Sequence, residues 1–209
     1  MIMNERKKVA IIDYGMGNLF SLAKALEYCG SLPEVVSDPV RLKYYTRAIL
    51  PGVGAFSDGM ANLCSVGWCS AIQDFSQKSD LLGVCLGMQL LADRGNEFSD
   101  TEGLGIISGE VLKIFPINTE KIPHIGWNEV KYIEQDLLFE NISINEDFYF
   151  VHSYHFQVND RSNIIATTDY AGGFVSIVKQ SNVYGVQFHP EKSGNAGLQL
   201  LKNFLRITR

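Results

Sequence analysis

The run from Leu82 to Gln89 places one cysteine, Cys85, between two glycines, Gly83 and Gly87. Apolar residues precede the cysteine and good helix formers follow it, so we expect it on the turn between a strand and a helix. Such a turn holds a nucleophile in a strained backbone conformation, and flanking glycines let other backbone pass close to it. Free N–H groups at a helix start also favour the thiolate. The pattern predicts a reactive cysteine, because a cysteine that only packs in a core needs no such glycines.

The elements that we expect to position this cysteine are a strand over residues 81–84 and a helix over residues 86–92. In that arrangement the backbone N–H of Leu86 lies beside the sulfur. It could receive the negative charge that develops on a carbonyl oxygen when a thiolate attacks the carbonyl carbon. The chemistry expected here is therefore nucleophilic attack on an acyl group.

A candidate base lies far along the chain, in His189-Pro190-Glu191. Alternating large and small residues over 183–188 predict a strand that ends at the proline. A proline biases the residue before it toward an extended conformation, and side chains two residues apart in an extended chain share a side. Glu191 can therefore bind one ring nitrogen of His189 and leave the other facing a thiol. Cys85, His189 and Glu191 supply a nucleophile, a base and an orienting carboxylate.

Two other patterns do not support a cofactor. Gly15-Met16-Gly17-Asn18 follows a predicted strand, as a dinucleotide-binding turn does, but position 20 is Phe instead of the third glycine. The histidines at positions 124, 152 and 155 lack the i, i+4 spacing of a helical metal-binding pair, and no acidic cluster accompanies them. We predict neither a nucleotide cofactor nor a metal.

The arrangement of elements predicts the fold class. In the first half, apolar strands are expected over residues 9–13, 34–37, 47–50 and 81–84, with helices over 19–28 and 58–77. This alternation is typical of a parallel sheet with helices on both faces. In the second half, shorter strands are expected over 109–115, 128–133, 148–153, 164–168, 174–179 and 183–188, before an amphipathic helix over 195–206. We therefore predict an α/β fold: an open, mostly parallel sheet flanked by helices, with antiparallel strands added to it in the C-terminal half.

Composition excludes several classes of protein. A chain of 209 residues, 46% of them hydrophobic, can form one well-packed domain, and we expect a single domain over residues 1–209. A net charge of −5 argues against nucleic acid or an anionic membrane as partner. No apolar stretch approaches the roughly 20 residues of a membrane span, and we expect a cytoplasmic protein. The cysteines at positions 29, 64, 69 and 85 form no Cys-x-x-Cys pair, so we expect reduced thiols.

The stretches 83–89 and 189–191 resemble the class I glutamine amidotransferases, which hydrolyse glutamine to glutamate and ammonia with a Cys-His-Glu triad. Further motifs are similar to one branch of that family, the glutaminase subunits of imidazole glycerol phosphate synthases. These motifs are Asp13 to Asn18, Leu50 to Phe56, Pro123 to Asn128, Phe150 to Tyr154 and His189 to Ser193. The likeness runs from about Val9 to Leu205. It implies a flavodoxin-like form of the fold, L-glutamine as substrate and no cofactor.

The resemblance also implies roles for residues around the triad. Residues 51–54 would form an oxyanion strand, in which the N–H of Gly52 or Val53 joins that of Leu86. Gln89 would hold the glutamine substrate. The wall that grips the amino-acid end of glutamine would consist of Ser153 and Tyr154.

The predicted elements leave no residues for a second domain that would use the ammonia. The resemblance implies a separate (β/α)8-barrel synthase, or cyclase, subunit that forms a heterodimer with this chain and makes imidazole glycerol phosphate and aminoimidazole carboxamide ribotide in histidine biosynthesis. It implies low glutaminase activity until that subunit binds its own ligand. The residues implied to contact it are Asn18, Trp127, Asn128 and Lys192, although a core position for Trp127 is an equal alternative.

Two other functions stay open at this point. His155 follows Ser153 and Tyr154, where the histidine-pathway members are expected to carry Tyr or another residue. The chain could therefore be a paralogous subunit that supplies ammonia to a surface-sugar amidotransferase. It could also be a catalytically silent binding module that keeps the fold.

Overall fold

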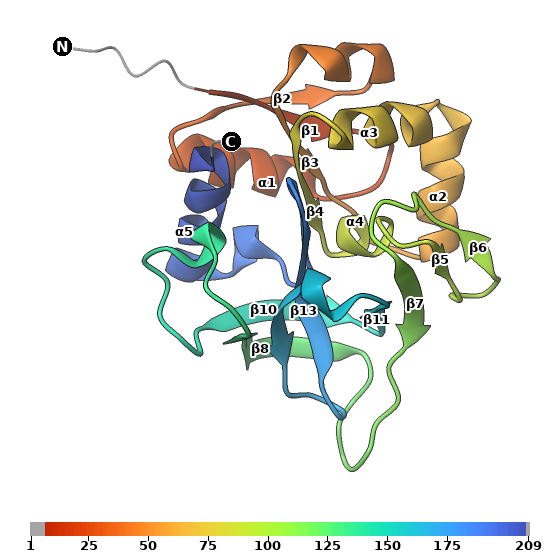
Figure 1. The fold of residues 1–209 in the computed structure, drawn as a ribbon, viewed down its shortest axis with the longest axis vertical. Coiled ribbons are helices and arrows are strands. Elements are labelled where there is room, and N and C mark those ends of the chain that lie inside the picture. The colour runs from red at the N-terminus through yellow and green to blue at the C-terminus, as the bar shows by residue number, and fades with distance from the viewer. Residues whose placement is uncertain (1–6, 208–209) are drawn as a thin grey trace.

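A computed structural model describes residues 7–207 of the chain (Figure 1). Its main element is an eight-stranded sheet with the order β2-β1-β3-β4-β14-β13-β12-β9. The strands are β1 (Lys8–Ile12), β2 (Leu32–Val36), β3 (Arg47–Leu50), β4 (Asp80–Val84), β9 (Lys131–Tyr132), β12 (Ile164–Thr168), β13 (Phe174–Gln180) and β14 (Val183–Val186). The first five strands in this order pair in parallel, and the remaining pairings are antiparallel. The predicted α/β class is confirmed.

Helices cover both faces of this sheet (Figure 1). They are α1 (Leu19–Tyr28), α2 (Phe56–Ser65), α3 (Trp68–Ser76), α4 (Leu86–Gln89) and α5 (Gly194–Arg206), with short 3-10 helices over Pro39–Tyr44, Leu137–Phe139, Arg161–Asn163 and Pro190–Lys192. Alternate residues of β1 face opposite sides: Val9 and Ile11 pack with α1 and α5, whereas Ala10 and Ile12 pack with α2 and α3. Within residues 7–207, none of the helices has both the length and the apolar character to cross a membrane.

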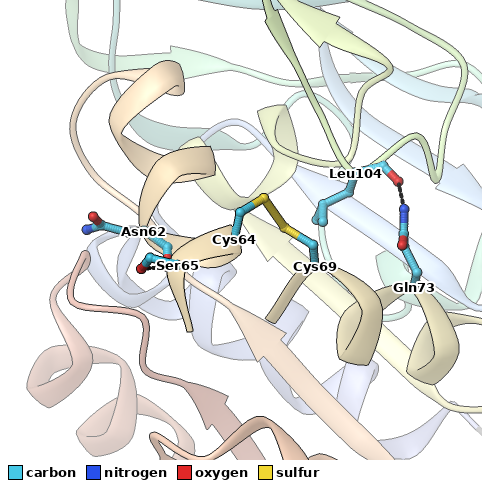
Figure 2. The surroundings of a disulfide bond; sticks show 6 residues. All are labelled: Asn62, Cys64, Ser65, Cys69, Gln73 and Leu104. Carbon is cyan, nitrogen blue, oxygen red and sulfur yellow. Dashed lines mark hydrogen bonds between the residues drawn. A yellow bond between two sulfur atoms is a disulfide. The ribbon is translucent and has the colours of Figure 1, made fainter. Parts of the chain in front are cut away.

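The helical region expected over residues 58–77 consists of two helices in the structure. Gly67 adopts a left-handed conformation with φ 83°, which ends α2 and starts α3 in a new direction. This bend brings Cys64 and Cys69 to a Cα–Cα distance of 5.4 Å, and their sulfur atoms form a disulfide (Figure 2). The expectation that both are reduced is therefore wrong for this structure, because the helix break was not visible in the sequence.

The second half builds two further small sheets. One pairs β8 (His124–Glu129) with β10 (Asp147–His152), and the other has the order β11-β7-β5-β6. The strands of the latter are β5 (Arg94–Gly95), β6 (Thr101–Glu102), β7 (Gly109–Lys113) and β11 (Tyr154–Val158). The expectation that residues 109–115 and 148–153 extend the main sheet is wrong. Their strand pattern was recognised correctly, but the partner of each strand depends on contacts between distant segments.

The strand order positions three chain segments at one edge of the main sheet. β3, β4 and β14 are neighbours, and parallel strands end at the same edge. Residues 51–54, Cys85 and residues 187–189 follow these three strands directly. Ser153 joins β10 to β11, where the chain passes from one small sheet to the other. The carboxyl edge of a parallel sheet is where α/β proteins commonly bind ligands.

Candidate active site

Cys85 lies on the predicted turn, between β4 and α4, with φ 53° and ψ −111°. A positive φ is unfavourable for a residue with a side chain, so packing must hold this conformation. The glycines on either side explain how. A Cβ at Gly83 would lie 2.6 Å from the carbonyl oxygen of Gly87, and a Cβ at Gly87 would collide with the carbonyl of Leu50. The expected close backbone approach is confirmed.

The helix after Cys85 is shorter than expected, ending at Gln89 instead of residue 92. The carbonyls of Leu90, Leu91 and Ala92 accept hydrogen bonds from the backbone of residues 104–107 instead of from a continuing helix. A contact distant in sequence thus ends the helix. The N–H groups of Met88 and Gln89 both donate to the Cys85 carbonyl, which makes the first turn.

His189 and Glu191 form the contact that their spacing predicts. His189 Nδ1 and Glu191 Oε1 are 2.9 Å apart, and both side chains are buried. His189 has the extended conformation expected before a proline, with φ −98° and ψ 97°. Burial by itself would lower the pKa of His189, but its interactions with the Cys85 sulfur and the Glu191 carboxylate outweigh burial and raise that pKa to about 9.

Cys85 and His189 line the same cavity, whose volume is about 350 Å³. His189 Nε2 is buried without a hydrogen-bond partner. The sequence-predicted residues that line this cavity with them are Val53, Leu86, Gln89, Ser153 and Tyr154. A cavity with a few convergent polar groups and a shifted histidine pKa is typical of an active site.

Glu97 is a cavity residue that sequence reasoning missed. Its Oε2 atom accepts a hydrogen bond from the backbone N–H of Phe56 at 2.8 Å. Burial and nearby Asp58 raise the pKa of Glu97, while the bond from Phe56 opposes that rise. No other residue that lines the cavity, among those described, carries a carboxylate. A single glutamate in an irregular segment carries no sequence signal, which explains the omission.

The predicted oxyanion donors do not face the cavity together. The N–H of Leu86 donates to the carbonyl oxygen of Gly52 at 3.3 Å. The peptide between Gly52 and Val53 therefore presents its oxygen to Leu86, and not its N–H. The preceding peptide is held by Tyr14, whose hydroxyl donates to the Pro51 carbonyl at 2.9 Å. This arrangement differs from the expected one, in which an N–H from residue 52 or 53 lies beside that of Leu86.

The residues expected to contact a partner lie in two places. Trp127 on β8 is 56% exposed, which excludes the core alternative, and its ring lies 6.0 Å from that of Tyr149. Lys192 Nζ is also 6.0 Å from the Tyr149 ring, so these three side chains form one surface group. Asn18 instead caps α1 through the Ser21 N–H and borders a small cavity beside His189 and Glu191.

Two of the remaining histidines, His124 and His152, make a hydrogen-bond chain. His124 Nδ1 lies 3.0 Å from His152 Nε2, and His152 Nδ1 lies 2.9 Å from the carbonyl oxygen of Tyr154. Asn128 Nδ2, from a residue expected at the partner surface, lies 3.3 Å from His124 Nε2. Burial lowers the pKa of His124 to about 4, and burial is also the main cause that lowers the pKa of His152 to about 3. Residues 7–207 contain no cluster of His, Cys, Asp and Glu side chains that could hold a metal ion.

Comparison with known proteins agrees with this geometry. A family model described as glutamine amidotransferase class-I matches residues 10–208. The chain is 46% identical over 203 residues to imidazole glycerol phosphate synthase subunit HisH 1 of Methanococcus maripaludis, covering 95% of this chain and 99% of that protein. It is 44% identical over 204 residues to subunit HisH of Moorella thermoacetica, with coverage of 97% and 96%. The structure of PurLQS from Thermotoga maritima is similar in fold alone, with a TM-score of 0.76, 20% identity and coverage of 96% and 98%.

Proposed function

Because this chain belongs to the class-I glutamine amidotransferase family, we propose that it hydrolyses L-glutamine and passes the ammonia to a separate synthase subunit in histidine biosynthesis. The observation that carries the proposal is the single cavity lined by both Cys85 and His189, with Glu191 bound to the histidine. The extent of the family match supports a single amidotransferase domain over residues 1–209. The expected cytoplasmic location stays a prediction.

The proposed reaction begins with the thiolate of Cys85 and the imidazolium of His189. The sulfur attacks the side-chain carboxamide carbon of glutamine, and the carbonyl oxygen becomes an oxyanion. The C–N bond then breaks as His189 Nε2 gives its proton to the nitrogen, which leaves as ammonia. Next, His189 takes a proton from a water that attacks the thioester. The C–S bond breaks, glutamate leaves, and the thiolate–imidazolium pair is restored. Glu191 orients the ring and stabilises its charged form.

The cavity walls supply groups for the amino-acid end of glutamine. We propose that the Glu97 carboxylate binds the substrate ammonium, since opposite charges attract strongly in a cavity of low dielectric constant. Gln89 holds the substrate from the first turn of α4, and Ser153 and Tyr154 form the opposite wall. The three sides of this subsite come from the irregular segment at Glu97, from α4, and from the link between β10 and β11.

The proposed oxyanion site requires a change in the segment after β3. The Leu86 N–H is engaged by Gly52, so the peptide between residues 52 and 53 must rotate before two N–H groups can face the substrate. One missing donor of this kind costs about 2.7 to 4 kcal/mol of transition-state stabilisation. We propose that docking of the synthase favours the rotated peptide, and that the isolated chain hydrolyses glutamine slowly.

We propose that the partner is a (β/α)8-barrel synthase that forms a heterodimer with this chain. The subunit names of the relatives support a separate synthase. The exposed group of Trp127, Tyr149 and Lys192 offers the combination of aromatic rings and a cation that is common in interfaces. Asn18 borders the small cavity that Gly52, His189 and Glu191 also line, so a partner docked at Asn18 would affect Gly52 as well. A partner docked near Asn128 would act on this residue through its hydrogen bond to His124.

Co-purification with the barrel protein of the same genome tests the proposal. Glutamate release is measured for the chain alone, for the complex, and for the complex with the synthase ligand. We expect release to rise at each step and imidazole glycerol phosphate to form in the last. Rapid glutamine hydrolysis by the isolated chain would contradict the proposed activation. Ammonia transfer only to a sugar-modifying partner would favour the paralogue, and no labelling of Cys85 by a glutamine-analogue electrophile would favour the silent module.

A further inference from the structure

Gln187 is a buried polar residue that the proposed mechanism does not use. It follows β14, two positions before His189, and its side chain is fully buried. Its Nε2 atom lies 3.8 Å from the Cys85 sulfur, and its Oε1 atom accepts a hydrogen bond from Gln89 Nε2 at 2.9 Å. A buried amide is costly unless its hydrogen bonds are made. This one is paired with the nucleophile and with a residue that lines the cavity.

The direction of these hydrogen bonds follows from one backbone group. The Tyr154 carbonyl can only accept, and Gln89 Nε2 lies 2.9 Å from it, so the Gln89 nitrogen must face Tyr154. Gln89 then donates its second N–H to Gln187, which must turn its oxygen toward Gln89 and its nitrogen toward Cys85. With both N–H donors engaged, the Gln89 amide has only its carbonyl oxygen left to offer to the cavity.

The other polar groups around the Cys85 sulfur explain why a hydrogen-bond donor matters at this position. The carbonyl oxygen of Val151 lies 4.0 Å from the Cys85 sulfur and is an acceptor, which disfavours a thiolate. The Gln187 amide donates an N–H hydrogen bond to that sulfur, in addition to the interaction of the sulfur with the His189 ring. A hydrogen bond to a charged group is stronger than one to a neutral group, so this contact strengthens when the thiol ionises.

We propose that Gln187 is a positioning residue of the glutaminase site. Its amide nitrogen stabilises the Cys85 thiolate, and its amide oxygen fixes Gln89 so that the Gln89 carbonyl receives an N–H group of the substrate. One side chain thereby links the ionisation of the Cys85 thiol to the binding of glutamine. The proposal has two halves. The substrate half, in which Gln187 fixes Gln89 for glutamine binding, rests on the proposed function. The thiolate half, in which Gln187 stabilises the Cys85 thiolate, does not depend on the substrate.

Two substitutions separate the halves. Gln187→Met has a similar size but can neither donate to Cys85 nor hold Gln89. Gln187→Glu keeps an oxygen for the Gln89 N–H, but it loses the donor and adds a negative charge beside the sulfur. Ser176→Ala is the matched control, because Ser176 is also buried in this sheet and, among residues 7–207, its hydroxyl bonds to Thr168 alone, at 2.8 Å. All variants are studied in the complex with the synthase, with wild-type circular dichroism as the test of folding.

The first measurement is the rate of Cys85 alkylation by iodoacetamide between pH 5 and 9, followed by peptide mass spectrometry, with Cys29 as internal reference. Gln187→Met should alkylate about tenfold more slowly than wild type at pH 7, and Gln187→Glu more slowly still, because a hydrogen bond to a charged group is worth about one factor of ten or more. Both should approach the wild-type rate at high pH. Ser176→Ala should match wild type throughout.

The second measurement is the steady-state KM for glutamine. Gln187→Met should raise KM about tenfold, whereas Gln187→Glu should leave KM within about twofold while kcat falls. Gln89→Met removes the Gln89 carbonyl that is proposed to bind the substrate. It should raise KM without slowing the alkylation of Cys85. Unchanged alkylation in both Gln187 variants overturns the thiolate half, and equal KM values for Gln187→Met and wild type overturn the substrate half. If the wild-type complex releases no glutamate, the proposed function fails, while the alkylation result still decides the thiolate half.

Discussion

The two sides of the active-site cavity differ in how completely they are assembled. On one side, Cys85 and His189 are buried and follow the neighbouring strands β4 and β14, and Glu191 binds His189 at 2.9 Å. On the other side, Val53 is 43% exposed, and the Gly52 carbonyl occupies the N–H group that an oxyanion would need. The nucleophile is thus ready before the group that stabilises the transition state. The difference supports the proposal that activity is controlled at residues 52–53 and not at the triad.

The physical reason for the difference is that more contacts hold the backbone at Cys85 than the backbone at residues 52–53. The strained angles of Cys85 are fixed by the pairing of β4 with a strand on each side, β3 and β14, and by backbone that packs against Gly83 and Gly87. Rotation of the peptide between Gly52 and Val53 breaks one hydrogen bond of 3.3 Å, and Val53 itself is partly exposed. A single peptide rotation is small enough for a docking partner to drive.

The largest expected effect comes from removing the nucleophile. Cys85→Ala should reduce glutamate release by the complex at least about ten-thousandfold, because no other thiol lies in the cavity. The melting temperature should stay close to that of wild type. Glutamate production near the wild-type rate would end the proposed mechanism.

Next in size is the effect of removing one proposed oxyanion donor. Val53→Pro lacks the backbone N–H, so kcat in the complex should fall about 100- to 1000-fold, while the alkylation rate of Cys85 stays at its wild-type value. This result would confirm that the two sides of the cavity act separately. An unchanged kcat would assign the donor to Gly52 instead of Val53.

Glu191→Gln should have an intermediate effect, with kcat about 100-fold lower, because the ring keeps a hydrogen-bond acceptor but loses a charge partner. The pKa of His189, about 9 in the wild type, is raised partly by this carboxylate, so it should fall in the variant. The protonated ring that supplies ammonia with its proton is then lost at a lower pH. The pH profile of kcat should therefore decline earlier on its alkaline side, and a profile that overlays the wild type would contradict the role of Glu191.

A smaller effect is expected at the exposed surface. Trp127→Ala should weaken binding of the synthase about 30-fold, the size typical of a central aromatic contact. The stability of the free chain should change by no more than about 0.5 kcal/mol, because the side chain is exposed. Isothermal titration calorimetry and thermal unfolding measure the two quantities. If Trp127→Ala binds the synthase with wild-type affinity, Trp127 is not part of the interface.

The smallest effect on activity is expected at the disulfide. Cys64→Ser opens a loop with a sequence separation of five residues, so it should lower the free energy of unfolding by about 2 kcal/mol. Glutamate release by the complex should not change, since neither cysteine lines the cavity. Urea unfolding monitored by circular dichroism checks the stability, and lost activity in a folded variant would link this helix junction to the site.

Patterns within short segments led to correct predictions. The glycines around Cys85, the proline after His189 and the apolar strands of the first half all act over a few residues, and the structure confirms the turn, the His189–Glu191 contact and the parallel sheet. Helix α1 also has the expected bounds. These features follow from local steric limits that a sequence carries directly.

Only the tertiary structure decided the features that depend on distant partners. The early end of α4, the pairing of β7 with β11 and of β10 with β8 outside the main sheet, and the contact of Gly52 with Leu86 all arise from hydrogen bonds between separate segments. The same holds for Glu97 and Gln187. No sequence motif marks either residue, and only the fold places Glu97 at the cavity and Gln187 beside the Cys85 sulfur. The sequence determined which chemistry is available, because steric rules act locally. Folding decided which polar groups are engaged, because each hydrogen bond needs a partner that another part of the chain supplies.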